Sequence, residues 1–162
     1  MLPPNNSGSE YVVVSAVNLA NGDYQTKAIL GSGSTVYMSQ KNLVVAGARY
    51  NGQEMVTSLL GLAVDGKGGL YYKDTVELPG RLDSQFALDE KDGYLRVALT
   101  STSPQGQPQN NLYILDDAMQ VCGGLTGLAP GEQIYAMRYI GDMGYMVTFE
   151  KTDPLFVLDL AD

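Results

Sequence analysis

Apolar and polar residues alternate with a period of two along most of the chain. The alternation is clear in YVVVSAVNL, NLVVAGAR, YLRVAL, LYIL, IYAMRYI and LFVLDL, and no window carries a convincing stripe with the helical period of 3.6 residues. Tyrosine, valine and threonine, which favour strands, are frequent in these runs. Turn-rich pieces such as NGD, DGKGG, EKDG and GDMG lie between them, as in short antiparallel hairpins. The pattern therefore predicts an all-β protein.

A fixed spacing shows that the chain is a repeat. A shift of 51 residues, from position 65 to position 116, pairs identical residues at five places: Asp65 with Asp116, Pro79 with Pro130, Gly80 with Gly131, Gly93 with Gly144, and Tyr94 with Tyr145. A period of about 50 residues with about four strands in each unit is typical of a propeller blade, whereas a sandwich need not repeat. We predict a β-propeller fold with about three four-stranded antiparallel blades.

The repeat also divides the chain. We expect a disordered N-terminal tail at residues 1–10, followed by a partial β-propeller domain at 11–162. Within it, 11–33 would supply the last two strands of one blade, 34–80 and 81–131 two complete blades, and 132–162 a partial blade. The first strand of the blade at 81–131 is expected over SQFALDE, residues 84–90. A propeller closes its ring with four to eight blades. Either the chain is part of a larger ring, or a homodimer completes a six-bladed ring in which each junction supplies one strand twice.

Composition removes several classes of function. Ten Lys and Arg against 18 Asp and Glu give a net charge of −8, which repels phosphate, so we expect no nucleic-acid partner. No apolar run approaches the length of about 20 residues that crosses a bilayer, so we expect no membrane insertion. The single cysteine, Cys122, reads as a small apolar residue at a strand end and excludes an intrachain disulfide. The lack of histidine excludes Ser-His-Asp and Cys-His catalysis and the commonest zinc ligand.

Two long strings resemble a known family. RLDSQFALDEKDGYLRVALTS, residues 81–101, and RYIGDMGYMVTFEKTDPLFVLDLAD, residues 138–162, resemble secreted bacterial and archaeal proteins with a C-terminal β-propeller domain distantly related to WD repeats. The similar pattern runs from about Tyr11 to the last residue. The resemblance implies an extracellular or cell-surface propeller that continues into further blades. It brings no established activity and no catalytic residues.

The acidic loop DEKDG has two interpretations. Asp92 and Gly93 form a dipeptide typical of a hairpin turn, because glycine accepts a positive φ there. The alternative is a calcium site formed by Asp89, Glu90 and Asp92, although calcium takes six to eight oxygen ligands and the EF-hand spacing is absent. We expect no other cofactor.

Further carboxylates end equivalent strands. Asp65, Asp116 and Asp159 follow the third strand of each unit, where an aspartate commonly caps the next turn through its side chain. Paired carboxylates could instead hydrolyse a glycosidic bond. We also expect the arginines Arg49 and Arg138, like Arg96, to pair with an aspartate of a neighbouring blade or to line the central channel.

The longest polar loop, TSTSPQGQPQNN, is the predicted contact surface for a partner. Its candidate residues are Gln105, Gln107 and Asn110, and the expected partner is a protein or polysaccharide at the cell surface. These features favour a non-catalytic extracellular scaffold or interaction module. The alternative is part of a secreted carbohydrate-active or other hydrolytic enzyme that uses Asp and Glu.

Overall fold

Strands make up nearly all of the regular structure. The computed structural model describes residues 11–31, 33–52, 54–149 and 154–161, so the predicted tail at 1–10 lies outside the described residues. Its elements are β1 (Tyr11–Val17), β2 (Tyr24–Leu30), β3 (Thr35–Met38), β4 (Asn42–Asn51), β5 (Glu54–Val64), β6 (Leu70–Pro79), η1 (Gln85–Ala87), β7 (Leu88–Lys91), β8 (Tyr94–Thr102), β9 (Pro108–Leu115), β10 (Val121–Leu128), β11 (Gln133–Ile140), β12 (Met143–Phe149) and β13 (Leu155–Asp159). Within these ranges, no helix is long and apolar enough to span a bilayer.

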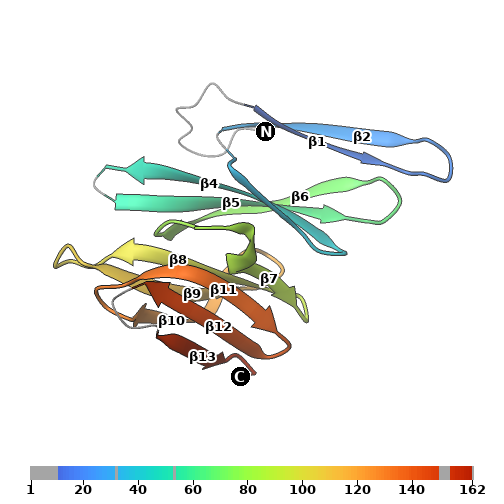
Figure 1. The fold of residues 1–162 in the computed structure, drawn as a ribbon. Coiled ribbons are helices and arrows are strands. Elements are labelled where there is room, and N and C mark those ends of the chain that lie inside the picture. Colours follow the sequence, from blue (N-terminus) through green and yellow to red (C-terminus); the bar gives the residue numbers. More distant parts are fainter. Residues whose placement is uncertain (1–10, 32, 53, 150–153, 162) are drawn as a thin grey trace.

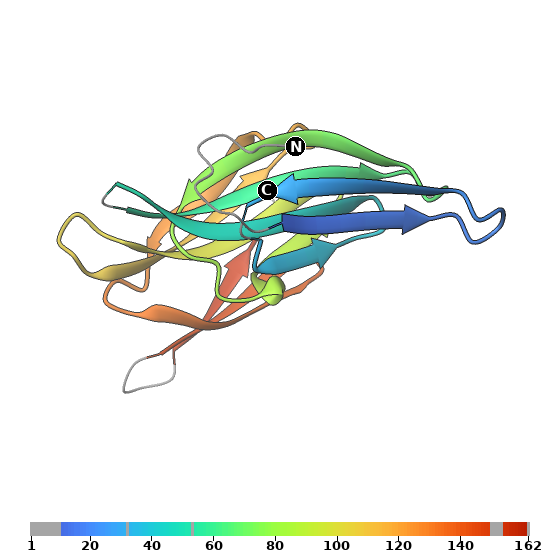
Figure 2. The ribbon, with the colours of Figure 1, turned by 90° about the horizontal axis from the view of Figure 1, so that it is seen from above.

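The strands form four antiparallel sheets that follow one another along the chain. Their strand orders are β1-β2, β3-β4-β5-β6, β10-β9-β8-β7 and β11-β12-β13. In Figure 1 these sheets lie as successive layers, with the β1–β2 hairpin at one end of the stack and the β11–β13 sheet at the other. Figure 2 shows the same strands from above. The prediction of an all-β fold built from four-stranded antiparallel units is confirmed.

Burial along each strand depends on how many of its faces are covered. In β4, four consecutive residues, Leu43–Ala46, are buried because this strand lies inside the stack with a sheet on each side. In β1, burial alternates residue by residue, because among the described residues another sheet packs on one face of this strand only.

Three apolar cores hold the layers together. Between the first and second sheets lie Ile29, Leu43, Val45, Leu60 and Leu62. The second and third sheets share a core that includes Val44, Leu59, Val97, Leu99 and Met119, and the third and fourth share one that includes Ala98, Leu112, Ile134, Met137 and Met146. Neighbours in one strand, such as Val44 and Val45, thus enter different cores, as the period-two alternation requires.

The first strand of the third sheet differs from the expectation. A strand was expected over SQFALDE, but the structure has a 3-10 turn at η1 followed by the four-residue β7. The turn closes with Ala87 N donating to Ser84 O at 3.1 Å, and the Ala87 carbonyl accepts a hydrogen bond from Tyr139 Oη at 3.2 Å. Since η1 contacts both β3 and β11, the first elements of three successive sheets lie side by side.

Candidate functional site

The acidic loop is a tight hairpin turn between β7 and β8. Lys91 pairs with Tyr94 across the hairpin, and Asp92 and Gly93 between them have φ values of 53° and 87°. Two central residues with positive φ are the signature of a type I′ turn, which matches the twist of the flanking strands. The turn interpretation of the DEKDG loop is confirmed.

Asp89 faces a buried arginine of its own sheet. It lies opposite Arg96 on the neighbouring strand, and Arg96 Nε donates to Asp89 Oδ2 at 2.9 Å while Nη2 forms a second contact with the same oxygen. Arg96 Nη1 also donates to the Gly141 carbonyl at 2.9 Å, and the guanidinium lies 4.9 Å from the centre of the Tyr139 ring. Asp89 therefore orients an arginine that joins the third sheet to the fourth.

Glu90 points the other way, toward the second sheet. Its carboxylate accepts hydrogen bonds from Ser39 Oγ at 2.7 Å and Asn42 Nδ2 at 2.8 Å, and its backbone N–H donates to Tyr37 Oη at 2.8 Å. The pKa of Tyr37 lies above its usual range, first because burial disfavours the phenolate. Glu90 is thus a link between the second and third sheets.

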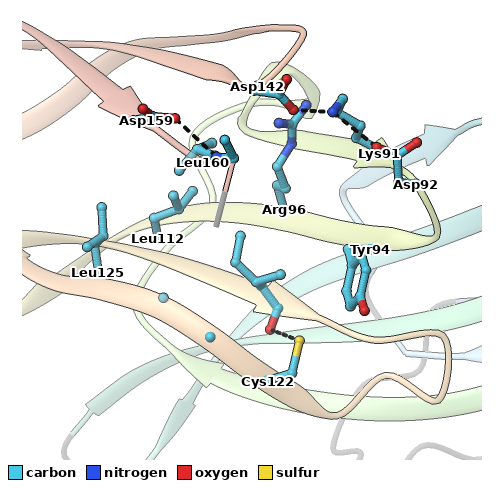
Figure 3. Close-up of a pocket in the computed structure, with 14 residues that line it drawn as sticks. Lys91, Asp92, Tyr94, Arg96, Leu112, Cys122, Leu125, Asp142, Asp159 and Leu160 are labelled. Atoms are coloured by element: carbon cyan, nitrogen blue, oxygen red, sulfur yellow. Dashed lines mark hydrogen bonds and ion pairs between the residues drawn. The ribbon is translucent and has the colours of Figure 1, made fainter.

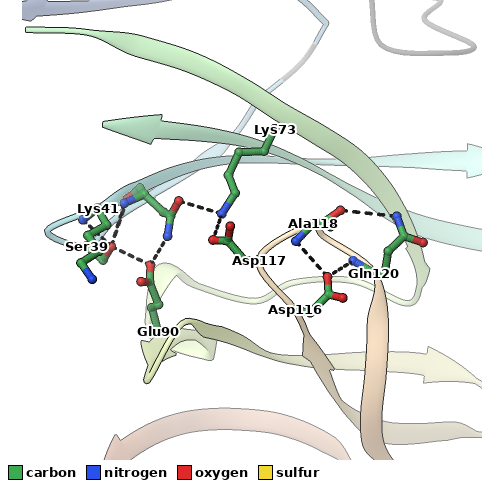
Figure 4. Close-up of polar contacts among 9 residues, drawn as sticks. Ser39, Lys41, Lys73, Glu90, Asp116, Asp117, Ala118 and Gln120 are labelled. Atoms are coloured by element: carbon green, nitrogen blue, oxygen red, sulfur yellow. Dashed lines mark hydrogen bonds and ion pairs between the residues drawn. The ribbon is translucent and has the colours of Figure 1, made fainter. Parts of the chain in front are cut away.

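A polar seam continues this link along the second and third sheets (Figure 4). Lys73 Nζ donates to Asn42 Oδ1 at 3.1 Å and forms an ion pair with Asp117 of the following sheet. The seam joins the second and third sheets through polar contacts. The charges of Glu90, Lys73 and Asp117 therefore have partners within the fold.

Asp92 takes part in a third set of contacts. Lys91 Nζ lies 3.0 Å from Asp92 Oδ2 and also pairs with Asp142 in the turn between β11 and β12 (Figure 3). The hydrogen bond to Asp142, followed by that to Asp92, raises the pKa of Lys91. Lys91 therefore ties the hairpin to the fourth sheet.

The three loop carboxylates consequently do not converge on one point. Asp89 bonds Arg96, Glu90 bonds Ser39 and Asn42, and Asp92 pairs with Lys91. Over the residues that the structure describes, no group of three or more Asp, Glu, Cys or His side chains is placed to hold a metal ion. In this geometry the loop acts as a connector between sheets.

The aspartates at the strand ends cap turns. Asp65 Oδ1 accepts the backbone N–H groups of Lys67 and Gly69, both at 2.8 Å, and these bonds, that of Gly69 first, lower the pKa of Asp65. Asp116 Oδ1 accepts those of Ala118 at 2.9 Å and Gln120 at 2.8 Å. Asp159 Oδ1 accepts that of Ala161 at 3.1 Å. The capping interpretation of these three aspartates is confirmed.

The predicted partner loop contains two exposed candidates and one buried residue. Gln105 and Gln107 are exposed in the loop between β8 and β9, whose turn is held by Ser103 N donating to Gln107 O at 2.7 Å. Asn110 is fully buried in β9, which corrects its assignment to the loop surface. Its amide donates to the carbonyls of Leu128 at 3.2 Å and Glu132 at 3.3 Å, and Oδ1 accepts from Ile134 N at 3.2 Å. Asn110 therefore links the start of β11 to the third sheet through hydrogen bonds.

The arginines also differ from the expectation. Arg49 pairs with Glu77 of its own sheet, and Arg96 pairs with Asp89 of its own sheet, so neither is held by an aspartate of a neighbouring sheet. The Arg138 guanidinium lies 4.0 Å from the centre of the Phe86 ring in η1. An aromatic face, which sequence reasoning had not considered, thus binds this arginine.

A groove of about 520 Å³ lies between the third and fourth sheets, and sequence reasoning missed it (Figure 3). One wall is apolar and includes Leu112, Ile114 and Leu125, and the ion pair of Lys91 with Asp142 lies at its rim. The glycine-rich CGGLTG run of β10, which exposes most of its residues, is the sequence signal that could have pointed to it. Cys122, expected as a small apolar residue at a strand end, is the second residue of β10 and lies exposed in the same wall.

Comparison with known proteins gives a family and two relatives. A family profile described as a beta propeller domain matches residues 1–162. An uncharacterized protein of Archaeoglobus fulgidus is 49% identical over 85 residues, which are 52% of this chain and 13% of that protein. An uncharacterized protein of Methanocaldococcus jannaschii is 50% identical over 88 residues, which are 53% of this chain and 14% of that protein. The match thus covers about an eighth of each relative, and no solved structure matches.

Proposed function

Because the chain belongs to the family of beta propeller domains, we propose that it is a non-catalytic interaction module whose exposed loops hold a partner outside the cell. The observation that carries this proposal is that the charged residues of the acidic loop pair with other groups of the fold. Asp89, Glu90 and Lys91 connect neighbouring sheets through ion pairs and hydrogen bonds. A glycosidase needs two carboxylates that face one substrate bond, and these side chains face other protein groups.

The loop between β8 and β9 is the proposed contact surface. Gln105 and Gln107 are exposed, and each amide can donate and accept hydrogen bonds. The loop is supported by the rigid strands β8 and β9, which pair over eight positions. A polar loop on a rigid sheet is a common arrangement in binding proteins.

The proposed location and partner rest on the resemblance of residues 81–101 and 138–162 to secreted propeller proteins. We propose that the module works at the cell surface and binds a protein or polysaccharide there. The net charge of −8 supports this choice over nucleic acid.

Binding to cell-envelope fragments tests the proposal. The labelled chain is incubated with archaeal envelope fragments, and both retained protein and released reducing sugar are measured. We expect retention without sugar release. Loss of retention after protease treatment of the fragments would identify a protein partner, and loss after periodate oxidation would identify a polysaccharide.

Variants locate the surface and separate binding from catalysis. Replacing Gln105 and Gln107 together by alanine should lower retention several-fold. Gln40→Ala, in the exposed turn between β3 and β4, lies outside this loop and should leave retention unchanged. Sugar release that Asp89→Asn or Asp116→Asn abolishes would overturn the proposal in favour of a hydrolase. Absence of retention on any fragment would also contradict it.

A further inference from the structure

A lysine, an asparagine and a glutamate meet between the second and third sheets. Lys73 Nζ of β6 donates to Asn42 Oδ1 at 3.1 Å, and Asn42 Nδ2 donates to Glu90 Oε2 at 2.8 Å. In Figure 4 the side chains of Lys73 and Glu90 point toward each other, and Asn42 bonds both. The three side chains are the groups that form a new amide: an amine, a carboxamide and a carboxylate that moves protons.

The site lies inside the stack, in apolar surroundings. Both of its sheets also pack on another sheet on their other face, so the elements that form the site have their neighbours in place. The Lys73 side chain is 13% exposed. The small cavity beside it is lined by the buried residues Val44, Leu95 and Met119, and its volume of about 10 Å³ is close to the space that one water needs. The amine is therefore the nucleophile in contact with the amide, with little room for competing water.

The strand order explains how Lys73 reaches Asn42. The two residues lie on β6 and β4, with β5 between these strands. The register of β5 with β6 shifts between Leu60 and Leu62, and the residue at this shift is Gly61, which also lines the cavity. Because glycine has no side chain, the long lysine side chain passes over β5 without a clash.

The three groups are specific to this boundary. A shift of 51 residues places Gly124 of the third sheet where the second has Lys73, and Gly93 where the second has Asn42. The third sheet thus forms its strands without these side chains. The repeated architecture by itself does not explain why they are present.

We propose that Lys73 and Asn42 join in an isopeptide bond between their side chains and that Glu90 promotes the reaction. The neutral Nζ attacks Asn42 Cγ, so a C–N bond forms and the bond from Cγ to Nδ2 breaks. Glu90 takes the proton that Nζ loses and gives it to Nδ2, which leaves as ammonia. One amide replaces another, so no oxidant, reductant or cofactor takes part. The reaction occurs once in each chain, and the inference holds whichever external partner the loops bind.

Asp117 opposes the reaction. It pairs with the Lys73 ammonium, whereas only the neutral amine is a nucleophile. The Asp117 side chain is 82% exposed, so water competes with this ion pair and weakens it. We therefore expect the bond to form slowly after folding, and faster in Asp117→Asn.

Mass spectrometry of the intact chain tests the bond. The folded chain is kept at neutral pH and denatured before each measurement, and we expect its mass to fall below that of the sequence by one ammonia. Trypsin should then release residues 42–49 linked to residues 68–81, with Lys73 uncleaved. A chain kept in guanidinium chloride should retain its full mass, because folding brings the three groups together.

Variants assign the role of each group. Lys73→Arg should retain its full mass, since a guanidinium does not attack the amide. Glu90→Gln should slow the loss of ammonia at least about 100-fold, because it removes the group that transfers the proton. Lys67→Arg, in an exposed turn of the same segment, is the matched control and should lose ammonia as the unaltered chain does. Circular dichroism shows whether each variant is folded, and the mass of the unaltered chain tests the bond without any variant.

Four outcomes would overturn the inference. Full mass in the folded chain after days at neutral pH would mean that the three groups form hydrogen bonds only. Loss of ammonia that persists in Lys73→Arg would indicate a succinimide at an asparagine. A gain in mass at Asn42 would indicate hydrolysis of its amide by water. An unchanged rate in Glu90→Gln would show that Glu90 does not transfer the proton.

Discussion

Replacing Arg96 by methionine tests whether the acidic hairpin is a structural connector. Arg96 is 5% exposed, bonds Asp89 and the Gly141 carbonyl, and lies against the Tyr139 ring. Methionine keeps much of the apolar stem and removes all three polar contacts. The contacts with Asp89 and with the Gly141 carbonyl both involve the charged guanidinium and contribute about 1.5–3 kcal/mol each, and the ring contact contributes about 0.5–1 kcal/mol.

The expected loss of unfolding free energy lies near the lower end of that range. The Asp89 side chain is 29% exposed, so water can solvate it in part when the arginine is gone. We expect Arg96→Met to lower the free energy of unfolding by about 3.5 kcal/mol, or Tm by about 7–14 °C for a domain of this size. Urea unfolding at one fixed protein concentration measures this loss, because self-association would add to the apparent stability.

A double-mutant cycle isolates the pair. Asp89→Asn keeps the shape of the side chain and removes its charge, and the Arg96→Met/Asp89→Asn double variant completes the cycle. We expect a coupling energy of about 1–2 kcal/mol between the two positions. Lys91→Met is the control and should have a much smaller effect, because its partner Asp142 has a half-exposed side chain. A coupling energy of zero would refute the connector role and leave Asp89 available for ion binding or chemistry.

Three further predictions concern the contacts between sheets. Asn110→Ala should lower the free energy of unfolding by about 2–4 kcal/mol, because it removes the hydrogen-bond partner of the Leu128 carbonyl in β10 and of the Ile134 N–H in β11. Gln105→Ala in the exposed loop should leave urea unfolding unchanged. A Cβ at Gly61 would lie 2.9 Å from Met119 Sδ, so Gly61→Ala should destabilise by about 1–3 kcal/mol, and by less when it is introduced into a Met119→Ala background. Gly123→Ala, whose nearest contact would be 3.8 Å, should be neutral in thermal melts. Burial raises the pKa of Tyr139. Because the unfolded state loses this proton above about pH 10 while the folded state keeps it, stability should fall as the pH rises through that range, and less steeply in Tyr139→Phe; equal slopes in urea unfolding would contradict this assignment.

The local features of the fold were readable from the sequence. Period-two alternation and the shift of 51 residues, as from Asp65 to Asp116, depend on residues close in the chain, and they predicted the strands and the four-stranded sheets. The Asp92-Gly93 turn and the aspartate caps were predictable for the same reason. Their hydrogen bonds and φ values are set within about five residues of the chain.

The sites could be predicted only in part, because they depend on which sheet lies next to which. Asn110 sits at the end of a polar string that looks like a loop, yet it is buried because β11 packs over that end of β9. Arg138 binds the Phe86 ring because η1, which the sequence pattern showed as a strand, brings that ring beside β11.

Alternation by itself determined that each strand has two different faces and that the chain is a series of similar sheets. The tertiary structure decided which faces meet. It alone shows that Val44 and Val45 enter different cores, that a groove opens beside β10, and that Tyr24 and Tyr135 are exposed. The physical reason is that period two assigns a residue to one side of its sheet, whereas burial depends on whether another sheet is packed against that side.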